Sequence, residues 1–264
     1  MNELAKRTLY INPNIQFLSN SNIVEYDMKN AGFSLIKKYD MLPKKKIEEL
    51  EKIGKEERLL DKKYGKQKQT ILIGKLQREN KELATKIKVA FEIERENFMT
   101  KNQLSEHDII SIKKDAFFVS TTKVIDGTID KFIKFRKKNS YSSYLYIKPL
   151  EIYYKRGINL EVKGISEDKQ SVHGEYMYGF IQKALHAYET RELPSVLYMM
   201  TTFIDKYKHL QLEPGYYREL NAQSKFSYLD GEKSEIEYRE NLSELDIMTN
   251  FQILLQMLQY FLEK

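Results

Sequence analysis

The sequence predicts an α+β fold in which short antiparallel strands are interrupted by a helical insertion and followed by a mainly helical C-terminal region. Three observations lead to this prediction. Short segments rich in β-branched and aromatic residues precede and follow a long segment with helical periodicity. The later strands are joined by tight polar turns, which favour antiparallel pairing. Beyond Gly164 the remaining pattern is mainly helical.

Two short strands are expected near the N-terminus, before any helix. They cover residues 8–11 and 22–27, and the second strand ends at Asp27. A helix is expected from Lys29 to about Tyr39. This order places the carboxylate of Asp27 at the carboxyl end of a strand.

A long helical region begins at Pro43, and we expect it to fold as two antiparallel helices. Gly54, Gly65 and Gly74 are candidate breaks within it. Apolar residues recur at helical spacing in its later part. They predict one buried stripe, formed by Leu72, Leu76, Leu83 and Ile87.

A β-hairpin is expected next, because apolar residues 109–112 and 116–119 flank the polar turn of residues 113–115. Asp115 would lie at its tip. A helix near residues 126–134 should follow. Three further strands are expected after it, at residues 144–147, 150–154 and 160–163.

The C-terminal part of the chain is expected to be helical at residues 175–190, 194–209 and 242–263. We find no internal repeat and no low-complexity linker. The pattern therefore divides the chain into four regions, which cover residues 1–40, 41–105, 106–166 and 167–264.

Charge is unevenly distributed along the chain. The formal net charge is +6, yet residues 41–90 and residues 131–164 each carry +7, whereas residues 210–264 carry −5. Clustered positive charge is typical of proteins that bind a polyanion such as nucleic acid. The first basic block is also compatible with ordinary solvated helices. In the second block basic residues alternate with Tyr and Phe, which favours a surface that combines charge with base stacking.

The composition excludes several kinds of site. The chain has no cysteine, which excludes disulfides, a thiol nucleophile and zinc sites of the finger type. Its four histidines are scattered, which argues against a histidine-rich metal site. We find no secretory signal and no apolar stretch long enough to span a bilayer. We therefore expect no membrane partner and a cytoplasmic protein, in the host cytoplasm if it is virus-encoded.

Two carboxylates stand out by their expected positions. Asp27 ends a strand and Asp115 lies at the tip of a hairpin, and they can meet only if those strands are neighbours in one sheet. Such a pair can bridge two Mg²⁺ ions about 3.5–4 Å apart, as in enzymes that transfer nucleotides. Taken singly, Asp27 could instead cap a helix and Asp115 could be an ordinary turn residue.

Four short strings occur in an order that resembles family B DNA polymerases. Residues 27–36 share a leading Asp, a Ser and an aliphatic pair with the first palm motif of that family, and residues 114–119 resemble half of its Asp-Thr-Asp-Ser hairpin. Residues 137–141 resemble its Lys-Lys-x-Tyr element, and residues 160–165 resemble the strand that ends in Lys-Gly-Ile. The resemblance covers about residues 20–166.

This resemblance implies a polymerase-like palm with an antiparallel sheet, a helical fingers insertion over residues 41–105 and a thumb-like region over residues 167–264. It also implies Mg²⁺ or Mn²⁺ as cofactor, and a DNA primer–template and nucleoside triphosphates as partners. The implied residue roles are metal binding and catalysis by Asp27 and Asp115, nucleotide binding by Lys75 and Arg78, and nucleic-acid binding by Lys137, Lys138, Tyr141 and Lys163.

The sequence also departs from the family pattern. Lys113 stands where the family hairpin has its first Asp, so two of the usual three palm acids are present. Gly32 and Phe33 replace the Tyr-Pro pair that excludes ribonucleotides in the family. About twenty residues precede the first motif, and we therefore expect no proofreading exonuclease domain.

Three functional hypotheses follow. The first is a template-directed nucleotidyltransferase, similar to a DNA polymerase, that adds nucleotides to a primer 3′-hydroxyl by two-metal phosphoryl transfer. The alternative is a non-catalytic nucleic-acid-binding protein or one subunit of a split polymerase, which would act with a second polymerase subunit or a replication protein. The third is a helical interaction protein whose C-terminal apolar helix, residues 247–262, binds a partner.

Overall fold

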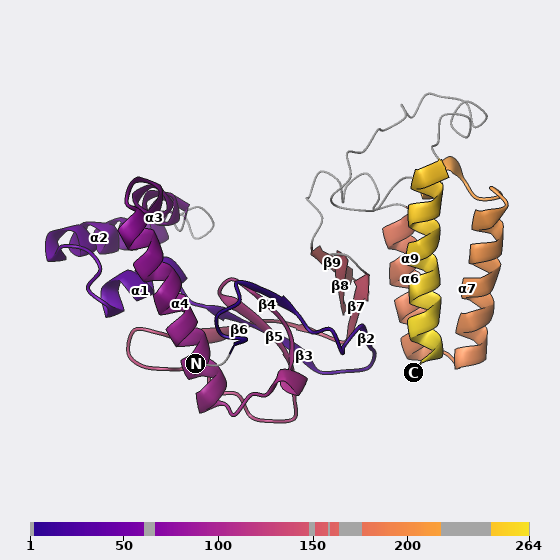
Figure 1. The fold of residues 1–264 in the computed structure, drawn as a ribbon, viewed down its shortest axis with the longest axis horizontal. Helices are drawn as coiled ribbons and strands as arrows, with labels where there is room; N and C mark the ends of the chain where they lie inside the picture. The colour runs from indigo at the N-terminus through magenta and orange to yellow at the C-terminus, as the bar shows by residue number, and fades with distance from the viewer. Residues whose placement is uncertain are drawn as a thin grey trace. The chain divides into compact units, whose positions relative to one another are not determined.

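The structure is a computed structural model, and it divides the chain into two compact units (Figure 1). The first unit comprises residues 1–12 and 24–140, and the second comprises residues 13–23 and 141–264. The predicted region 106–166 is thus shared between the two units. The structure describes residues 3–60, 67–147, 151–157, 159–163, 176–217 and 244–263.

The first unit is built on a five-stranded, mainly antiparallel sheet with strand order β1-β4-β5-β3-β6. A short 3₁₀ helix, η1 (Glu106–Asp108), precedes β4. The predicted hairpin is confirmed, because β4 and β5 are joined by the two residues Lys114 and Asp115. The strands are β1 (Leu9–Ile11), β3 (Ile23–Met28), β4 (Ile109–Lys113), β5 (Ala116–Ser120) and β6 (Phe135–Tyr141).

The helical insertion lies between β3 and β4. Its helices are α1 (Ala31–Lys38), α2 (Lys44–Leu60), α3 (Gln67–Glu79) and α4 (Lys81–Lys101). The prediction of two helices after Pro43 was wrong, since the described residues of this region form three, which are α2, α3 and α4. Gly54 and Gly74 lie inside α2 and α3, and Gly65 is outside the described residues. The chain breaks instead at Asn80, whose side chain caps α4 by accepting a hydrogen bond from the backbone N–H of Leu83.

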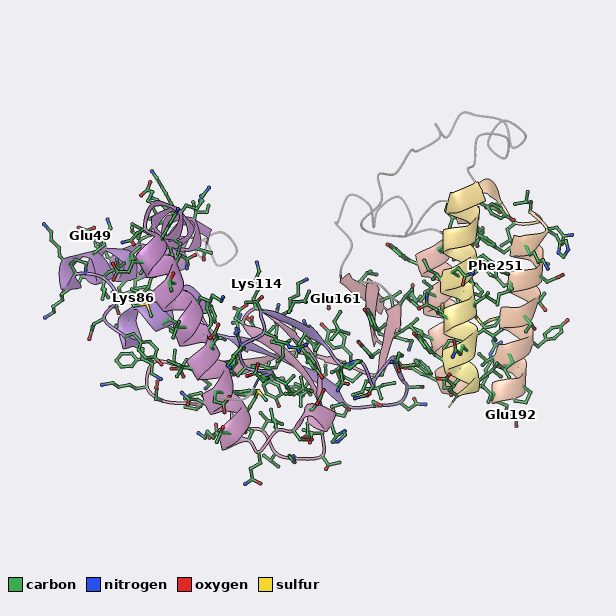
Figure 2. All side chains as sticks on the ribbon, in the orientation of Figure 1. Glu49, Lys86, Lys114, Glu161, Glu192 and Phe251 are labelled. Carbon is green, nitrogen blue, oxygen red and sulfur yellow. The ribbon has the colours of Figure 1, made fainter. Side chains whose placement is uncertain are left out.

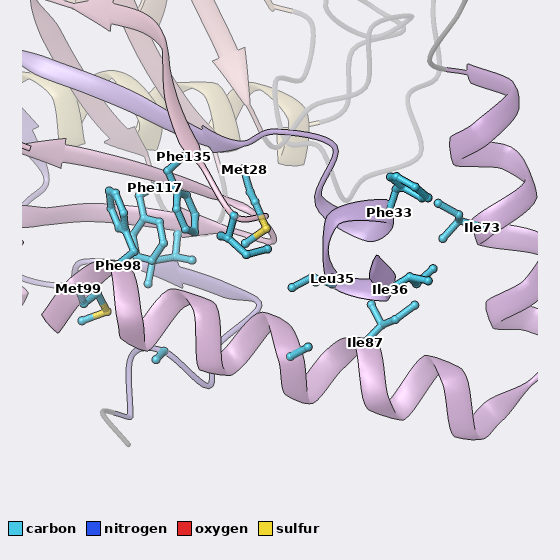
Figure 3. Packing of buried hydrophobic residues seen from close by; sticks show 14 of the residues in the cluster. Met28, Phe33, Leu35, Ile36, Ile73, Ile87, Phe98, Met99, Phe117 and Phe135 are labelled. Carbon is cyan, nitrogen blue, oxygen red and sulfur yellow. The ribbon is translucent and has the colours of Figure 1, made fainter. Parts of the chain in front are cut away.

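The core of the first unit is centred on three phenylalanine rings that join α4 to the sheet (Figure 3). The ring centroid of Phe98 on α4 lies 5.0 Å from that of Phe117 on β5 and 4.4 Å from that of Phe135 on β6. All three side chains are buried. This packing fixes α4 against the sheet and so fixes which face of α4 turns away from it.

Helix α1 links the sheet to the rest of the insertion. Figure 3 shows Phe33 of α1 beside Ile73 of α3, and Ile36 of α1 beside Ile87 of α4. The predicted apolar stripe is part of this core, but it is shared between α3 and α4. Its α4 members are fully buried, whereas Leu72 and Leu76 of α3 are partly buried.

The segment from Thr121 to Lys134 is irregular, so the helix predicted near residues 126–134 was wrong. Its only regular pairing is a single bridge between Thr128 and Lys134. The side chain of Asp130 accepts hydrogen bonds from the backbone N–H groups of Phe132 and Ile133, which closes a local turn. The strand β6 that follows was not predicted.

The second unit contains a four-stranded antiparallel sheet and three long helices. The strands pair in the order β2-β7-β8-β9, and they are β2 (Phe17–Leu18), β7 (Ser143–Ile147), β8 (Glu151–Arg156) and β9 (Asn159–Lys163). Helix α7 lies beside both other helices (Figure 1). The helices are α6 (Met177–Thr190), α7 (Leu193–Lys208) and α9 (Glu244–Leu262), with a short 3₁₀ helix η2 (Pro214–Tyr217).

The apolar side of α9 belongs to the core of this second unit. Leu254, Met257 and Phe261 are fully buried, and the ring of Phe261 lies 5.0 Å from that of Phe17 on β2. This face is therefore covered within the chain, which contradicts the hypothesis that it binds a partner. None of the described helices is both long enough and apolar enough to cross a membrane.

Candidate functional site: an acidic pair in a basic cavity

The two aspartates that the sequence singled out are held next to each other by the sheet of the first unit. Asp27 lies at the end of β3, and Asp115 lies in the turn before β5, which is the neighbour of β3 in the sheet. The backbone N–H of Met28 donates a 3.1 Å hydrogen bond to the carbonyl of Asp115. The expectation that the two strands are neighbours is thus confirmed.

The tight turn that carries Asp115 depends on a left-handed residue. Lys114 has a φ of 56°, and its backbone N–H donates a 2.7 Å hydrogen bond to the carbonyl of Thr8. A two-residue hairpin needs positive φ at its first central position, which any residue other than Gly, Asn or Asp adopts at some cost. Figure 2 shows Lys114 at this hairpin tip.

Both aspartates line one cavity of about 730 Å³ inside the first unit. The cavity lies where the sheet meets the helical insertion. Its apolar walls include Phe33 of α1 and Phe91 of α4. Its basic side chains come from three elements and are Lys88 and Arg95 of α4, Lys114 of the hairpin and Arg136 of β6.

The two carboxylates have different electrostatic surroundings. Burial raises the pKa of Asp115, and the negative charge of Asp27 raises it further. Asp27 lies 3.4 Å from the guanidinium of Arg136, measured from Oδ2 to Nη2. Asp115 has no ion pair within the part of the chain that the structure describes. The pair is therefore an acidic centre whose charge is only partly neutralised.

Arg95 supports the hairpin through a hydrogen bond to its backbone. Its side chain is almost fully buried, and it donates hydrogen bonds from Nε to the carbonyl of Ala5 at 2.6 Å and from Nη1 to the carbonyl of Lys114 at 3.0 Å. Burial lowers the pKa of Arg95, while the charges of Glu92 and Asp115 oppose that change. Nη2 is buried and has no hydrogen-bond partner among the described residues, and Arg95 lines the cavity.

Lys75 and Arg78, the residues expected to bind a nucleotide, lie on α3 but do not line this cavity. Nζ of Lys75 lies 3.8 Å from Glu79, and Nε of Arg78 donates a 3.3 Å hydrogen bond to the carbonyl of Gly74. Within the helical insertion, the basic residues that line the cavity come instead from α4. Lys88 and Arg95 are seven positions apart, which is two helical turns, and this spacing on one face was the signal in the sequence.

The residues expected to contact nucleic acid are distributed over both units. Lys137 and Lys138 lie on the first-unit part of β6, where Nζ of Lys138 lies 3.0 Å from the buried carboxylate of Glu25. Lys137 is exposed. In the second unit, the hydroxyl of Tyr141 donates a 2.5 Å hydrogen bond to Glu161. Lys163 lies on β9 opposite Ile152, and its side chain is outside the described residues.

Over the described residues, no cluster of three or more His, Cys, Asp or Glu side chains could hold a metal ion. Lys113, which stands where a third acid was expected, is exposed at the end of β4. Two carboxylates are thus the protein ligands that the cavity offers. Phe33, at the position of the missing family Tyr-Pro pair, is nearly buried and lines the same cavity.

Fold and site together define an α+β protein with an acidic pair in a basic cavity at the end of two neighbouring strands. A family model described as Bacteriophage PBS1 gene 130 protein matches residues 1–262, and the chain belongs to this family. A search of curated proteins finds no match. The family is named after a bacteriophage protein.

Proposed function

We propose that the first unit is a polymerase-like palm with a helical fingers insertion, and that its cavity binds a nucleoside triphosphate at a primer end. One observation carries this proposal: Asp27, near the carboxyl end of β3, and Asp115, in the turn before the neighbouring strand β5, line one cavity together with four basic side chains. Nucleotidyl transfer needs carboxylates for metal ions and cations for the phosphates. The phage family is compatible with a role in DNA replication.

The two carboxylates fit Mg²⁺ or Mn²⁺, because both ions prefer carboxylate oxygens. A divalent ion would also offset the repulsion between Asp27 and Asp115, which contributes to the raised pKa of Asp115. Bound there, the ion would activate the primer hydroxyl and neutralise charge on the reacting phosphate. Lys88 and Lys114 line the same cavity and would contact the other phosphates. Arg95 would hold the hairpin that carries Asp115 in position.

A second candidate function is favoured by the basic residues Arg136 and Lys113. Arg136 is already paired with Asp27, and Lys113 stands in place of an acid. A protein that binds nucleic acid without catalysis, or one subunit of a split polymerase, could keep the basic cavity while a basic residue replaces one of the acids. In that case a second polymerase subunit or a replication protein would supply the missing chemistry.

Primer extension distinguishes the two functions. The assay uses the full chain, a DNA primer–template, deoxynucleoside triphosphates and Mg²⁺ or Mn²⁺. Polymerase activity predicts extension that is lost in Asp27→Asn and Asp115→Asn while primer–template affinity is retained. Asp40→Asn is the matched control, because Asp40 is exposed, does not line the cavity and has a positive φ that Asn tolerates.

Absence of extension with salt-sensitive DNA binding would support the non-catalytic function. Absence of both would contradict both functions. Primer extension that persists in Asp115→Asn would show that catalysis does not depend on the acidic pair, even if the protein binds DNA.

A further inference from the structure

The second unit contains a separate cavity of about 790 Å³ that the proposed function does not use. It is lined by residues of α6 and α7, by Leu212 and by Tyr216 of the 3₁₀ helix η2. Its floor is apolar and aromatic. The rings of Phe180 and Phe203 are stacked with centroids 3.6 Å apart, and Tyr216 meets Phe203 edge-on at 5.4 Å.

The rim of this cavity is positively charged. Lys183 of α6, Arg191 of the following loop and Lys206 of α7 line it, and all three are exposed. None of them has an ion-pair partner within the described part of the chain. No described lining residue is Asp or Glu. Among the described residues, the rim therefore presents three cations without an acidic partner around an apolar floor.

The apolar floor and the basic rim together are typical of a pocket that binds another protein. Interfaces combine an apolar, aromatic centre with a polar rim, and Tyr, Met and Arg are enriched at them. Tyr198 is 74% exposed at the edge of the cavity, and Met199 lines the wall beside it. The exposed ring of Tyr198 and the flexible thioether of Met199 can adjust to an inserted side chain at a small cost in free energy.

A single-stranded nucleic acid fits this cavity less well. Such ligands stack their bases on exposed ring faces. Here the faces of Phe180 and Phe203 are already stacked on each other, and Phe180 is 8% exposed. The concave apolar floor instead accommodates a bulky apolar side chain of a peptide. The cations at the rim favour a peptide in which acidic residues flank that side chain.

We infer that this cavity binds an acidic peptide segment of another protein, which inserts a large apolar side chain between α6 and α7 while its carboxylates meet Lys183, Arg191 and Lys206. The inference does not depend on the proposed function, because every residue that carries it belongs to the second unit.

The test measures fluorescence anisotropy of the full chain with a short fluorescein-labelled peptide in which glutamates flank one phenylalanine. Binding should weaken about tenfold in Lys183→Glu and Lys206→Glu, as for rim charges that face carboxylates. Lys208→Glu is the matched control, because Lys208 is exposed on the same helix but does not line the cavity. Its affinity should equal that of the parent chain.

A second peptide, with serine in place of phenylalanine, should bind at least about tenfold more weakly, because the apolar floor would stay unfilled. Absence of binding by the first peptide would overturn the inference, as would equal loss in the Lys208→Glu control. A thymidine oligonucleotide is the third probe. If Lys183→Glu weakens its binding and leaves the peptide unaffected, the cavity is a nucleic-acid surface and the inference is wrong.

Discussion

Arg136 and Asp27 form an ion pair across β6 and β3, with Nη2 and Oδ2 3.4 Å apart. Both residues line the cavity of the first unit, and the guanidinium is about two-fifths exposed. The acid at the end of β3 therefore already faces a cation that would compete with a divalent metal ion. We therefore expect the ion pair between Arg136 and Asp27 to lower the affinity of the acidic centre for a divalent ion.

Replacing Arg136 by Gln should tighten Mn²⁺ binding about twofold to fivefold, because an exposed ion pair is worth less than about 1 kcal/mol. Electron paramagnetic resonance of free Mn²⁺ measures the change. Lys137→Gln is the control, since Lys137 is the next residue on β6 and its side chain points to the opposite face. Unchanged Mn²⁺ affinity in Arg136→Gln would mean that Asp27 does not contact the ion.

Asp115→Asn should stabilise the protein at neutral pH. Burial and the charge of Asp27 raise the pKa of Asp115, so the folded state binds its proton more tightly than the unfolded state does. The parent therefore loses stability as the pH rises from the ordinary Asp value through the raised pKa, and the variant lacks this loss. Urea unfolding followed by tyrosine fluorescence is a suitable measurement, since the chain has 19 Tyr and no Trp.

The two proteins should have similar stability at pH values below the ordinary Asp pKa. A variant that is less stable than the parent at every pH would show that the Asp115 carboxylate supports the hairpin. A gain in stability together with a loss of extension would identify Asp115 as a residue kept for function.

Arg95→Met should destabilise the first unit by about 2–5 kcal/mol, because it leaves the carbonyls of Ala5 and Lys114 without their hydrogen bonds in a buried place. Met roughly preserves the apolar volume of the side chain. The control is Lys88→Met, an exposed change on the same face of α4, which should alter the free energy of unfolding by less than about 0.5 kcal/mol. Equal effects would show that the two hydrogen bonds of Arg95 contribute nothing specific.

The sequence was most informative where structure is local. The two apolar runs on either side of the polar turn at Lys114 and Asp115 predict a hairpin, and the run that ends at Asp27 predicts a strand, because both patterns depend on neighbours in the chain. The proximity of the two acids could also be inferred, since it required only that β3 and β5 be adjacent.

The sequence was least informative where side chains compete with the backbone or where tertiary packing decides. The predicted helix after the hairpin is replaced by a turn, because Asp130 accepts hydrogen bonds from backbone N–H groups. Gly54 and Gly74 were taken as possible helix breakers but lie inside helices, whereas the cap at Asn80 ends one helix and begins the next. The prediction that Lys75 and Arg78 bind a nucleotide missed the basic residues of the cavity, because the rotation of each helix depends on its core contacts.

Phe98→Ala should cost about 3–5 kcal/mol, the range for removing a buried aromatic side chain. The ring joins α4 to both β5 and β6, so its loss leaves a cavity between helix and sheet. Val89→Ala is the control on the same helix, because Val89 is 45% exposed. A cost below about 1 kcal/mol for Phe98→Ala would mean that the neighbouring rings collapse into the space.

The second unit contains a buried ion pair whose contribution to stability should depend on pH. Lys155 of β8 donates to Glu189 of α6, and Ser143 of β7 donates to the same carboxylate. Burial alone would raise the pKa of Glu189, but the hydrogen bonds from Lys155 and Ser143 lower it overall. The stabilisation is therefore present above the ordinary Glu pKa and is lost as the pH falls toward the lowered value.

Lys155→Met should destabilise the second unit by about 3–5 kcal/mol at neutral pH, because it leaves the Glu189 carboxylate buried without its cation. The double variant Lys155→Met/Glu189→Leu should recover much of this loss, since no uncompensated charge remains. Urea unfolding at neutral and acidic pH measures both effects. The deficit of the single variant should shrink as Glu189 becomes protonated, and a deficit that stays constant with pH would show that the lysine acts through packing alone.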